Sequence, residues 1–320
     1  MLIGQDTSRP KTLDELIDAR LAAKLDGLDV LSRKMLAGKL PGERRSKRRG
    51  RSVEFDDFRD YVAGDDLRHL DWNVYARLDR FFIKLFREEE DLSVTVAIDV
   101  SASMDSGKPS KAAWAARLAT ALAYVGLINQ NRVSLASFGA GPLRVMAPVR
   151  GRSSVKATAA FVLEALAENT KHAKTTEDFG RSMTRLASSR STRGVIVVIS
   201  DWLMEEGWQK GLNALGGATM NGGLDAYAVM VATPEELDPK KAEGAGLFGD
   251  LQLTDIESGR VAEVTVSDAT VARYQELRAR HESEWKHACT ARGVAPFVIS
   301  TATAVDDVVL NSLRRGGLVW

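Results

Sequence analysis

The sequence has little of several residues on which common enzyme chemistries depend. Among its 320 residues there is one cysteine, Cys289, and there are four histidines. A single cysteine excludes an intrachain disulfide and a cysteine-based metal site, and it is compatible with a reducing compartment. The sequence contains no His-Glu-x-x-His zinc motif, no Gly-x-Ser-x-Gly nucleophile elbow and no Walker-type Gly-Lys-Ser/Thr loop. These absences argue against a zinc protease, an α/β-hydrolase and a P-loop NTPase.

Long apolar runs are also missing. No stretch is long enough to cross a bilayer, and residues 1–11 lack the apolar region of a signal peptide. We therefore expect a cytoplasmic protein with no membrane contact.

The net charge gives no sign of an acidic or basic partner, because 44 Lys and Arg residues balance 43 Asp and Glu residues. One stretch is uneven: six of the eight residues 44–51 are basic. Such a run could form a nucleic-acid arm. No aromatic side chain interleaves it, so we favour a solvated loop that pairs with neighbouring acids, and a nucleic-acid partner is not expected.

The pattern of apolar residues divides the chain in two. Leucines and isoleucines at helical spacing, with Thr12 and Glu15 as a capping box, predict a helix over residues 12–40. A charged and aromatic segment without a clean period follows, and then a strand at residues 81–86. From residue 91, apolar strands alternate with helices, which predicts a Rossmann-like α/β domain with a mostly parallel sheet and helices on both faces.

We accordingly divide the chain into an N-terminal helix with a charged β extension, residues 1–90, and an α/β domain, residues 91–320. The strands are expected at residues 94–100, 132–138, 143–148, 194–200, 225–232 and 296–300, the helices at 111–127, 154–166, 178–188, 208–215, 267–292 and 305–315, and a hairpin at 251–266.

Two of the expected strands end in oxygen-bearing side chains. The first ends at Asp99 and runs into Ser101 and Ser103, and a later one ends at Ser200 and Asp201. In an open parallel sheet, ligands bind outside the carboxyl ends of the strands. Mg²⁺ takes oxygen ligands in octahedral geometry and keeps several waters. The pattern therefore predicts a cation site, and the plainer alternative is a strand-to-helix turn in which Ser or Asp caps the next helix.

This strand end resembles the metal-ion-dependent adhesion site of von Willebrand factor A domains, in which Asp-x-Ser-x-Ser follows a buried strand. The resemblance implies an A-like domain over about residues 91–303. In that family a later loop contributes a Thr, which is carried over to Thr176, and a later strand end contributes an Asp, which is carried over to Asp201.

The Thr-bearing loop departs from the family pattern. The family often has Gly-Thr-Asp-Leu there, whereas residues 174–179 read Lys-Thr-Thr-Glu-Asp-Phe, without a Gly and with one extra residue. A gap-free match places Glu177 in the metal shell, and Thr175 is a further candidate. The resemblance thus implies Mg²⁺, or Mn²⁺ or Ca²⁺, held by Asp99, Ser101, Ser103, Thr176 and Asp201.

A second resemblance lies upstream. Residues 54–77 read Glu-Phe-x-x-Phe-Arg-x-Tyr-x-x-Gly-Asp-Asp-x-Arg-x-x-Asp-Trp-x-x-x-Ala-Arg, and residues 255–259 read Asp-x-Glu-Ser-Gly. Both are similar to a bacterial domain-of-unknown-function family, number fifty-eight, in which the first signature precedes a von Willebrand A-like domain. We expect the charged side chains of this signature to form an ion-pair network that docks the N-terminal segment onto the A-like domain, rather than an active site.

The family resemblance also implies a role. Its members often sit beside MoxR-type AAA+ ATPases in genomes, which implies work in the assembly or maturation of other proteins. Neutral Ser and Thr ligands leave a bound cation under-neutralised, so that it attracts a carboxylate. We therefore expect a metal-dependent protein-protein interaction module and not an enzyme, with an acidic residue of such an ATPase or of its client as the partner.

Two other functions have weaker support in the sequence. A metal-dependent phosphohydrolase would use Asp99 as nucleophile or ligand, but the similar haloacid dehalogenase-like phosphatases have Asp-x-Asp where position 101 here is Ser. A nucleic-acid binder would use the basic run at residues 44–51. Trp202, which follows Asp201, is a candidate for the rim of the cation site.

Overall fold

The computed structural model describes residues 9–30, 55–62, 65–86, 92–168, 178–188, 194–204, 207–239, 249–254 and 261–320. The chain forms two compact units. The larger unit combines Met1–Lys39 with Leu92–Trp320, and the smaller unit is Leu40–Asp91. The first helices thus belong to the same unit as the α/β domain, whereas the division expected from the sequence groups them with residues up to 90.

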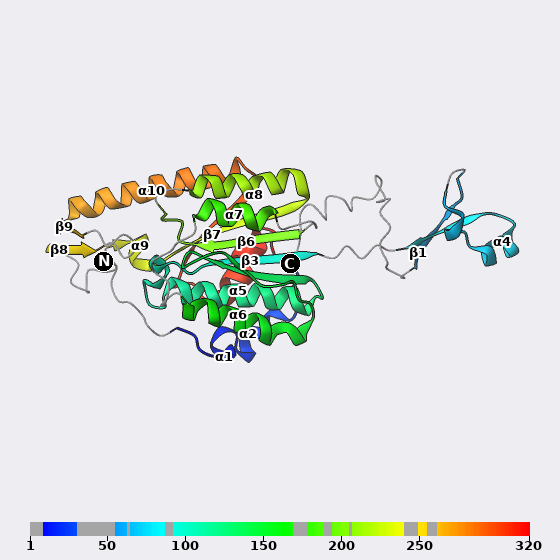
Figure 1. Cartoon of the computed structure of the whole chain (residues 1–320), viewed down its shortest axis with the longest axis horizontal. Helices are drawn as coiled ribbons and strands as arrows, with labels where there is room; N and C mark the ends of the chain where they lie inside the picture. The colour runs from blue at the N-terminus through cyan, green and yellow to red at the C-terminus, as the bar shows by residue number, and fades with distance from the viewer. Residues whose placement is uncertain are drawn as a thin grey trace. The chain divides into compact units, whose positions relative to one another are not determined.

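The larger unit is built on a six-stranded sheet of order β10-β7-β6-β3-β4-β5 (Figure 1). Neighbouring strands are parallel except β4 and β5, which pair antiparallel at one edge. All seven residues of the central strand β3 are buried, as expected for a strand covered on both faces. The sheet strands are β3 (Ser93–Asp99), β4 (Arg132–Phe138), β5 (Arg144–Val145), β6 (Gly194–Ser200), β7 (Leu224–Ala232) and β10 (Val294–Ser300).

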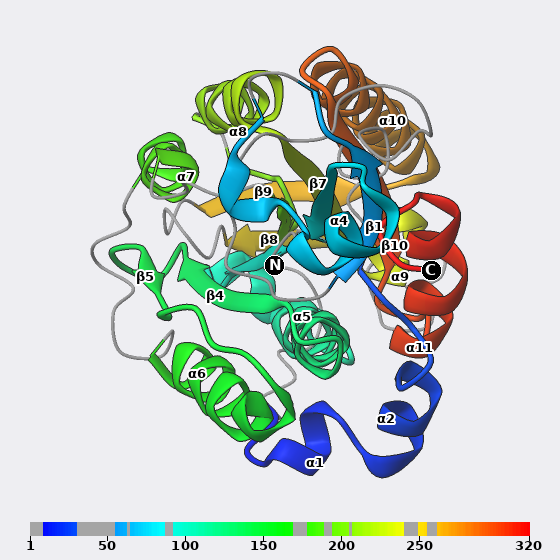
Figure 2. The same cartoon turned by 90° about the vertical axis from the view of Figure 1, so that its right-hand side faces the viewer.

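Helices cover both faces of this sheet, which confirms the predicted α/β class (Figure 2). Along β3 the residues alternate: Val96 and Ile98 face one helix layer, and Ala97 faces the other. The first layer contains α5 (Lys111–Ile128), α6 (Val155–Glu168) and α11 (Val305–Asp307). The second contains α7 (Phe179–Ser188), α8 (Trp208–Gly222) and α10 (Asp268–Thr290).

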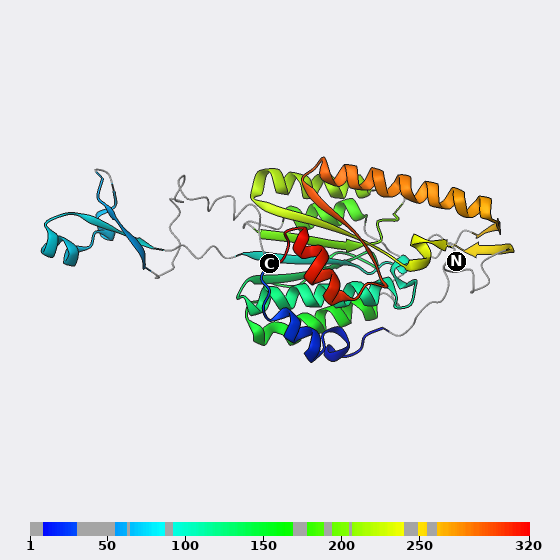
Figure 3. The same ribbon diagram turned by 180° about the vertical axis from the view of Figure 1, so that it is seen from behind.

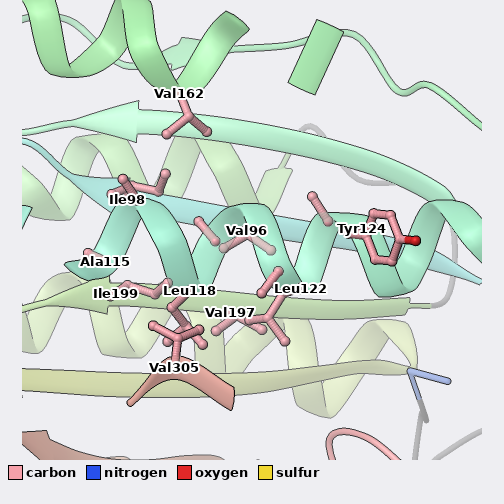
Figure 4. Close-up of a cluster of buried hydrophobic side chains, with 14 of the residues drawn as sticks. Val96, Ile98, Ala115, Leu118, Leu122, Tyr124, Val162, Val197, Ile199 and Val305 are labelled. Atoms are coloured by element: carbon pink, nitrogen blue, oxygen red, sulfur yellow. The ribbon is translucent and has the colours of Figure 1, made fainter. Parts of the chain in front are cut away.

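Helix α5 lies at the centre of the first layer and is buried on almost every side. Its Leu118 and Leu122 lie among Val96, Ile199 and Val305, which come from two strands and α11 (Figure 4). Its many alanines keep the helix thin enough to sit between the sheet and the other helices. Burial of this helix extends to its first residue, a lysine, which takes part in the site described below.

The long N-terminal helix expected over residues 12–40 is instead two short helices, α1 (Leu13–Leu16) and α2 (Ala19–Leu25), in the part that the structure describes. Residues 31–40 lie outside the described residues. Figure 3 shows α1 and α2 beside the C-terminal segment, where Val30 and Val319 form a β-bridge. Buried leucines of both helices join the core of the larger unit, which explains why these helices belong to it.

The caps of these helices show why the chain breaks between them. Thr12 makes no side-chain cap bond, so the predicted capping box is wrong. Glu15 accepts instead from the backbone N–H of Lys11 at 2.7 Å. Asp18 begins the second helix, because its Oδ1 accepts from the N–H of Leu21 at 2.6 Å. A strong N-cap thus starts a new helix where the apolar spacing alone predicts continuation.

The smaller unit is a hairpin with a helix between its strands. Strand β1 (Phe55–Asp60) pairs antiparallel with β2 (Phe82–Phe86), and a 3₁₀ turn, η1 (Leu67–His69), and α4 (Trp72–Leu78) connect them. Asp71 caps α4 by accepting from the N–H groups of Asn73 and Val74. Tyr75 of α4 stacks on Phe81, with ring centroids 4.4 Å apart.

Charged side chains of the upstream signature form ion pairs within this smaller unit. The pairs are Arg59 with Asp65 (2.7 Å), Arg68 with Asp66 (2.8 Å) and Lys84 with Asp71 (3.0 Å). These ion pairs therefore contribute to the smaller unit's own fold, and the docking of this segment onto the A-like domain stays a prediction. The basic run at residues 44–51 lies outside the described residues.

Two further elements follow β7 in the larger unit. A short helix, α9 (Pro234–Leu237), lies directly after the strand, so it sits at the carboxyl edge of the sheet (Figure 1). The expected hairpin is present as β8 (Gly249–Thr254) and β9 (Val261–Val266), which pair antiparallel. Among the described residues, no helix has the length and apolar character needed to span a membrane.

Candidate metal centre

The candidate site lies at the carboxyl edge of the sheet, where two neighbouring strands end. Strands β3 and β6 are parallel and in register, with Ile98 opposite Ile199. Their last residues are Asp99 and Ser200, so the acids and hydroxyls that follow the strands meet at one edge. After Asp99 the chain turns through Ser101 into a 3₁₀ turn, η2 (Ala102–Asp105).

The carboxylate of Asp99 is the centre of this site. It is 2% exposed. Its Oδ1 accepts from the N–H of Ser101 at 2.8 Å, and its Oδ2 accepts from the hydroxyl of Ser200 at 2.6 Å. These bonds fix the orientation of the carboxylate. In the described parts of the chain, no ion pair joins Asp99 to a Lys or Arg side chain, so its charge has no partner of opposite sign.

Ser101 and Ser103 present a pair of hydroxyls on the same loop. Their Oγ atoms are 3.1 Å apart and share a hydrogen bond. Two adjacent ligands of an octahedral Mg²⁺ ion, each about 2.1 Å from the metal, are about 3.0 Å apart. The spacing of the hydroxyls therefore fits adjacent positions around such a cation, with the Asp99 carboxylate below them supplying negative charge.

Gly139 closes the site from the neighbouring strand β4. Its φ is +99°, a conformation that L side chains rarely adopt. A Cβ at this position would lie 2.4 Å from Asp99 Oδ1 and 2.8 Å from the backbone nitrogen of Ser101. Only glycine fits here, so the backbone of this residue forms part of the cradle around the Asp99 carboxylate.

Asp201 lies next to the site, but its carboxylate is already engaged. Its Oδ2 accepts from Lys111 Nζ at 2.9 Å, and its Oδ1 accepts from the N–H of Leu203 at 3.2 Å. The same ammonium donates to Glu236 Oε1 at 2.8 Å. Lys111 is completely buried. Because the Lys111 ammonium already neutralises its charge, Asp201 is better placed to contact a cation through water than directly.

Asp99 and Lys111 both have shifted pKa values. Burial, and then the negative charge of Asp201, raise the pKa of Asp99 to about 7, although the bonds from Ser200 and Ser101 oppose the shift. Burial would lower the pKa of Lys111, but the carboxylates of Asp201 and Glu236 outweigh it and raise that pKa. Asp99 therefore takes up its charge at a cost that a nearby cation would offset.

Not every predicted ligand can be placed. Thr176, Thr175 and Glu177 lie outside the described residues, so the Thr position stays a prediction. Among the described residues, no group of three or more His, Cys, Asp or Glu side chains is arranged to hold a metal ion. The ligand set with hydroxyl groups that the resemblance implies stays a prediction.

Trp202 does not form a rim to the site. It is completely buried, and its Nε1 donates to the carbonyl of Val229 at 3.1 Å. Its ring packs in the second helix layer, 5.2 Å from that of Phe179 and 5.4 Å from that of Trp285. A large apolar ring gains more from this core than from an exposed rim, and a φ of 56° turns the residue inward directly after Asp201.

Sequence reasoning missed four residues: Ser200 as a bonding partner, Gly139, Lys111 and Glu236. Only Ser200 and Gly139 had a signal, because each stands at the end of a strand that neighbours β3. Lys111 stands 90 residues from Asp201 and 125 from Glu236 in the chain, so no local pattern reports their contact.

Comparison with known proteins gives matches along most of the chain. A family model described as "Protein of unknown function DUF58" matches residues 57–284. An uncharacterized protein of Mycobacterium tuberculosis (strain ATCC 25618 / H37Rv) is 29% identical over 312 residues, covering 95% of this chain and 93% of that protein. An uncharacterized protein of Mycobacterium bovis has the same identity and coverage.

Solved structures are similar at low sequence identity. An aerotolerance-related membrane protein from Bacteroides fragilis is 18% identical with a TM-score of 0.43, covering 70% of this chain and 99% of that one. The VWA domain of SpRpn10 is 13% identical with a TM-score of 0.39, covering 69% and 94%. The covered parallel sheet and the Asp-x-Ser-x-Ser loop at its edge are those of a von Willebrand A-like domain, as the sequence resemblance predicted.

Proposed function

Because the chain belongs to the DUF58 family and its larger unit has a von Willebrand A-like fold, we propose that it is a protein-interaction module whose contact with a partner depends on a divalent cation. The observation that carries this proposal is the Ser101–Ser103 hydroxyl pair, 3.1 Å apart, beside a buried Asp99 that has no cationic partner in the described chain. A buried carboxylate without a counter-charge is costly, so the fold keeps it where a cation from solvent can offset that cost.

In this proposal the residues contribute differently to cation binding. Asp99 supplies the negative charge, and Ser101 and Ser103 supply neutral oxygens. Asp201 acts through water, and the family resemblance adds a Thr at position 176 or 175. The chemistry that a divalent cation would supply is an open coordination position with residual positive charge, which a carboxylate of a partner protein completes.

The proposed partner is a MoxR-type AAA+ ATPase or a client of that ATPase. This choice is supported by the family resemblance. It is tested by retaining such an ATPase on the immobilised full chain, with Mg²⁺ or with chelator. We expect retention only with the cation, and the double variant Ser101→Ala, Ser103→Ala should lose it while keeping the circular dichroism spectrum of the wild type. Equal retention with chelator would reject the cation-dependent contact.

The cation itself is tested by thermal unfolding of the purified chain. A ligand that binds only the native state stabilises it by about 2.7 kcal/mol at a hundred times its Kd, so Mg²⁺ should raise the melting temperature. Asp99→Ala should abolish the rise. Asp225→Ala is a matched control, because Asp225 is also buried but lies at the amino end of β7. Identical wild-type curves in Mg²⁺, Mn²⁺, Ca²⁺ and chelator would reject the site.

We favour binding over catalysis on the chemistry of the same residues. Among the described residues, the only ammonium near the site is that of Lys111. It is completely buried and bonds to two carboxylates. Position 101, where a phosphatase of the haloacid dehalogenase type has an acid, is a serine. We expect no turnover of p-nitrophenyl phosphate with Mg²⁺, and turnover that Asp99→Ala abolishes would favour the enzyme instead.

A further inference from the structure

Lys111 is an unusual residue for a helix that lies in a protein core. It is the first residue of α5, after the N-cap Ser110, and none of its surface is exposed. Its ammonium bonds two carboxylates, those of Asp201 and Glu236. A fully buried charge must be paired, but replacing a buried ion pair with apolar groups of similar size is often neutral or stabilising. Stability alone is therefore a weak reason for a lysine here.

The two carboxylates are held independently of Lys111. Glu236 forms a capping box with Thr233: its Oε2 accepts from the N–H of Thr233 at 2.9 Å, and its own N–H donates to Thr233 Oγ1 at 3.1 Å. Asp201 is fixed by the N–H of Leu203. The lysine therefore does not create the positions of these acids, and its distinct contribution is one positive charge beside the cation site.

The charges around the site can be counted. Asp99, Asp201 and Glu236 are three carboxylates, and Lys111 is one ammonium, so the ionised group carries a net charge of −2. A divalent cation beside Asp99 then makes the group neutral. Without the lysine, the group would remain at −1 with the cation bound. A negative group would repel an acidic partner residue that approaches the cation.

We propose that Lys111 sets the charge of the cation site, and that it thereby limits cation affinity and preserves the attraction of the bound cation for an acidic partner. This inference rests on the proposed cation-dependent function. By holding Asp201 Oδ2, the ammonium also keeps that carboxylate from becoming a second charged ligand. The bound cation then has one charged ligand, Asp99, and its residual positive charge stays available for the partner.

The test is a set of four full-length proteins whose site charge differs in known steps. Lys111→Met, which is neutral and similar in length, changes the group from −2 to −3. Glu236→Gln changes it to −1, and the double variant Lys111→Met, Glu236→Gln restores −2. Isothermal titration with Mg²⁺ alone measures the Kd of each protein, and circular dichroism shows whether each is folded.

We expect the Kd for Mg²⁺ to follow the charge. It should fall on the order of tenfold in Lys111→Met, rise on the order of tenfold in Glu236→Gln, and return to within about threefold of the wild type in the double variant. Lys24→Met is the control for loss of a distant charge, because Lys24 of α2 pairs with Asp306 of α11, and it should leave the Kd unchanged.

The outcomes separate the inference from the proposed function. If the wild type binds Mg²⁺ but the four Kd values agree within about twofold, Lys111 is only a structural ion-pair partner and the inference is wrong. If the wild type shows no Mg²⁺ binding, the proposed function fails first. Should Lys111→Met not fold, the comparison of wild type, Glu236→Gln and the double variant still decides, because the expected order of Kd values is the same.

Discussion

Replacing Asp99 by asparagine should make the cation-free protein more stable at slightly alkaline pH, although it removes the central ligand of the proposed site. Asparagine has the size of aspartate and cannot ionise. Its side-chain oxygen can accept from the N–H of Ser101, and its amide can donate to the hydroxyl of Ser200, so both existing hydrogen bonds have a counterpart. The substitution therefore removes a buried charge with little change of shape.

The size and sign of the effect follow from the pKa of Asp99, which burial and then the charge of Asp201 raise from its ordinary 3.8 to about 7. A carboxyl whose pKa is raised in the folded state stabilises the fold fully below 3.8, and that contribution is lost as the pH rises through 7. A rise of the pKa from 3.8 to about 7 corresponds to at most about 4 kcal/mol. We expect about 2 kcal/mol of it in Asp99→Asn at pH 8, since local relaxation and water reduce buried-charge penalties.

The assay is urea unfolding in chelator at pH 5 and pH 8. At pH 5 the carboxyl of Asp99 is mostly protonated in the folded state but already mostly ionised in the unfolded state, so only part of the contribution is lost and the gain in Asp99→Asn should be smaller than at pH 8. At pH 8 the variant should be the more stable. Adding Mg²⁺ at pH 8 should raise the stability of the wild type and leave that of the variant unchanged. Cation binding would then favour Asp at position 99, and stability without the cation would favour Asn.

One result would refute this reasoning. If Asp99→Asn is less stable than the wild type by the same amount at both pH values in chelator, the carboxylate is not penalised by its burial. Burial of Asp99 would then give no energetic reason for a cation to bind beside it. A control at the surface, Asp306→Asn, should not show the same gain at pH 8, because the ammonium of Lys24 lowers the pKa of Asp306.

Three further changes test the cradle, the cysteine and the core. Gly139→Ala should destabilise the protein by about 2 kcal/mol or more and abolish the Mg²⁺-dependent rise in melting temperature, because its Cβ would meet the Asp99 carboxylate. Gly141→Ala is the control, because the space around its Cβ position is open, and it should change neither the stability nor the Mg²⁺-dependent rise. Cys289 is completely buried, and burial raises its thiol pKa to about 12, so a thiol reagent at pH 8 should modify it only in denaturant. Leu122→Ala should lower the free energy of unfolding by about 3 kcal/mol in urea titration, and Leu122→Met by less than about 1.5 kcal/mol.

Much of the larger unit could be predicted because its signals are local. Runs such as residues 195–199 are apolar throughout, which is the pattern of a strand covered on both faces. The Asp-x-Ser-x-Ser loop could be located for the same reason, because Asp99, Ser101 and Ser103 come from one turn of chain after one strand. The resemblance to von Willebrand A domains then linked this loop to Asp201, which the sheet order places on the adjacent strand.

Other features depend on hydrogen bonds that the spacing of apolar residues does not show. The apolar repeat at the N-terminus continues through Asp18, but that side chain caps a backbone N–H and starts a second helix. Near the C-terminus the predicted helix over residues 305–315 begins as α11 and continues as a π-helical segment, Val308–Leu313. Burial of its apolar residues against α5 and the sheet is compatible with either hydrogen-bonding pattern, so periodicity did not distinguish them.

The buried ion pairs could not be predicted from the sequence for a further reason. A lysine in the first turn of a helix is normally solvated, and position 111 has no local feature that marks it as buried. Its partners are Asp201, which follows β6, and Glu236 of α9, which follows β7, and the fold brings them to one edge. The two strand-end acids consequently differ in a way that their sequence motifs do not show: within the described residues, Asp201 pairs with a basic side chain and Asp99 does not.

This difference between the two acids also explains how one sheet edge can be both stable and ready to bind. A pair of adjacent carboxylates with no counter-charge would repel each other strongly in a buried site. Lys111 neutralises one member through Asp201, so the remaining repulsion is confined to Asp99, where the pKa is raised. Asp99 is in turn the carboxylate beside the Ser101 and Ser103 hydroxyls. The arrangement thus concentrates the electrostatic cost at the position where a cation can relieve it, and leaves the neighbouring acid fixed.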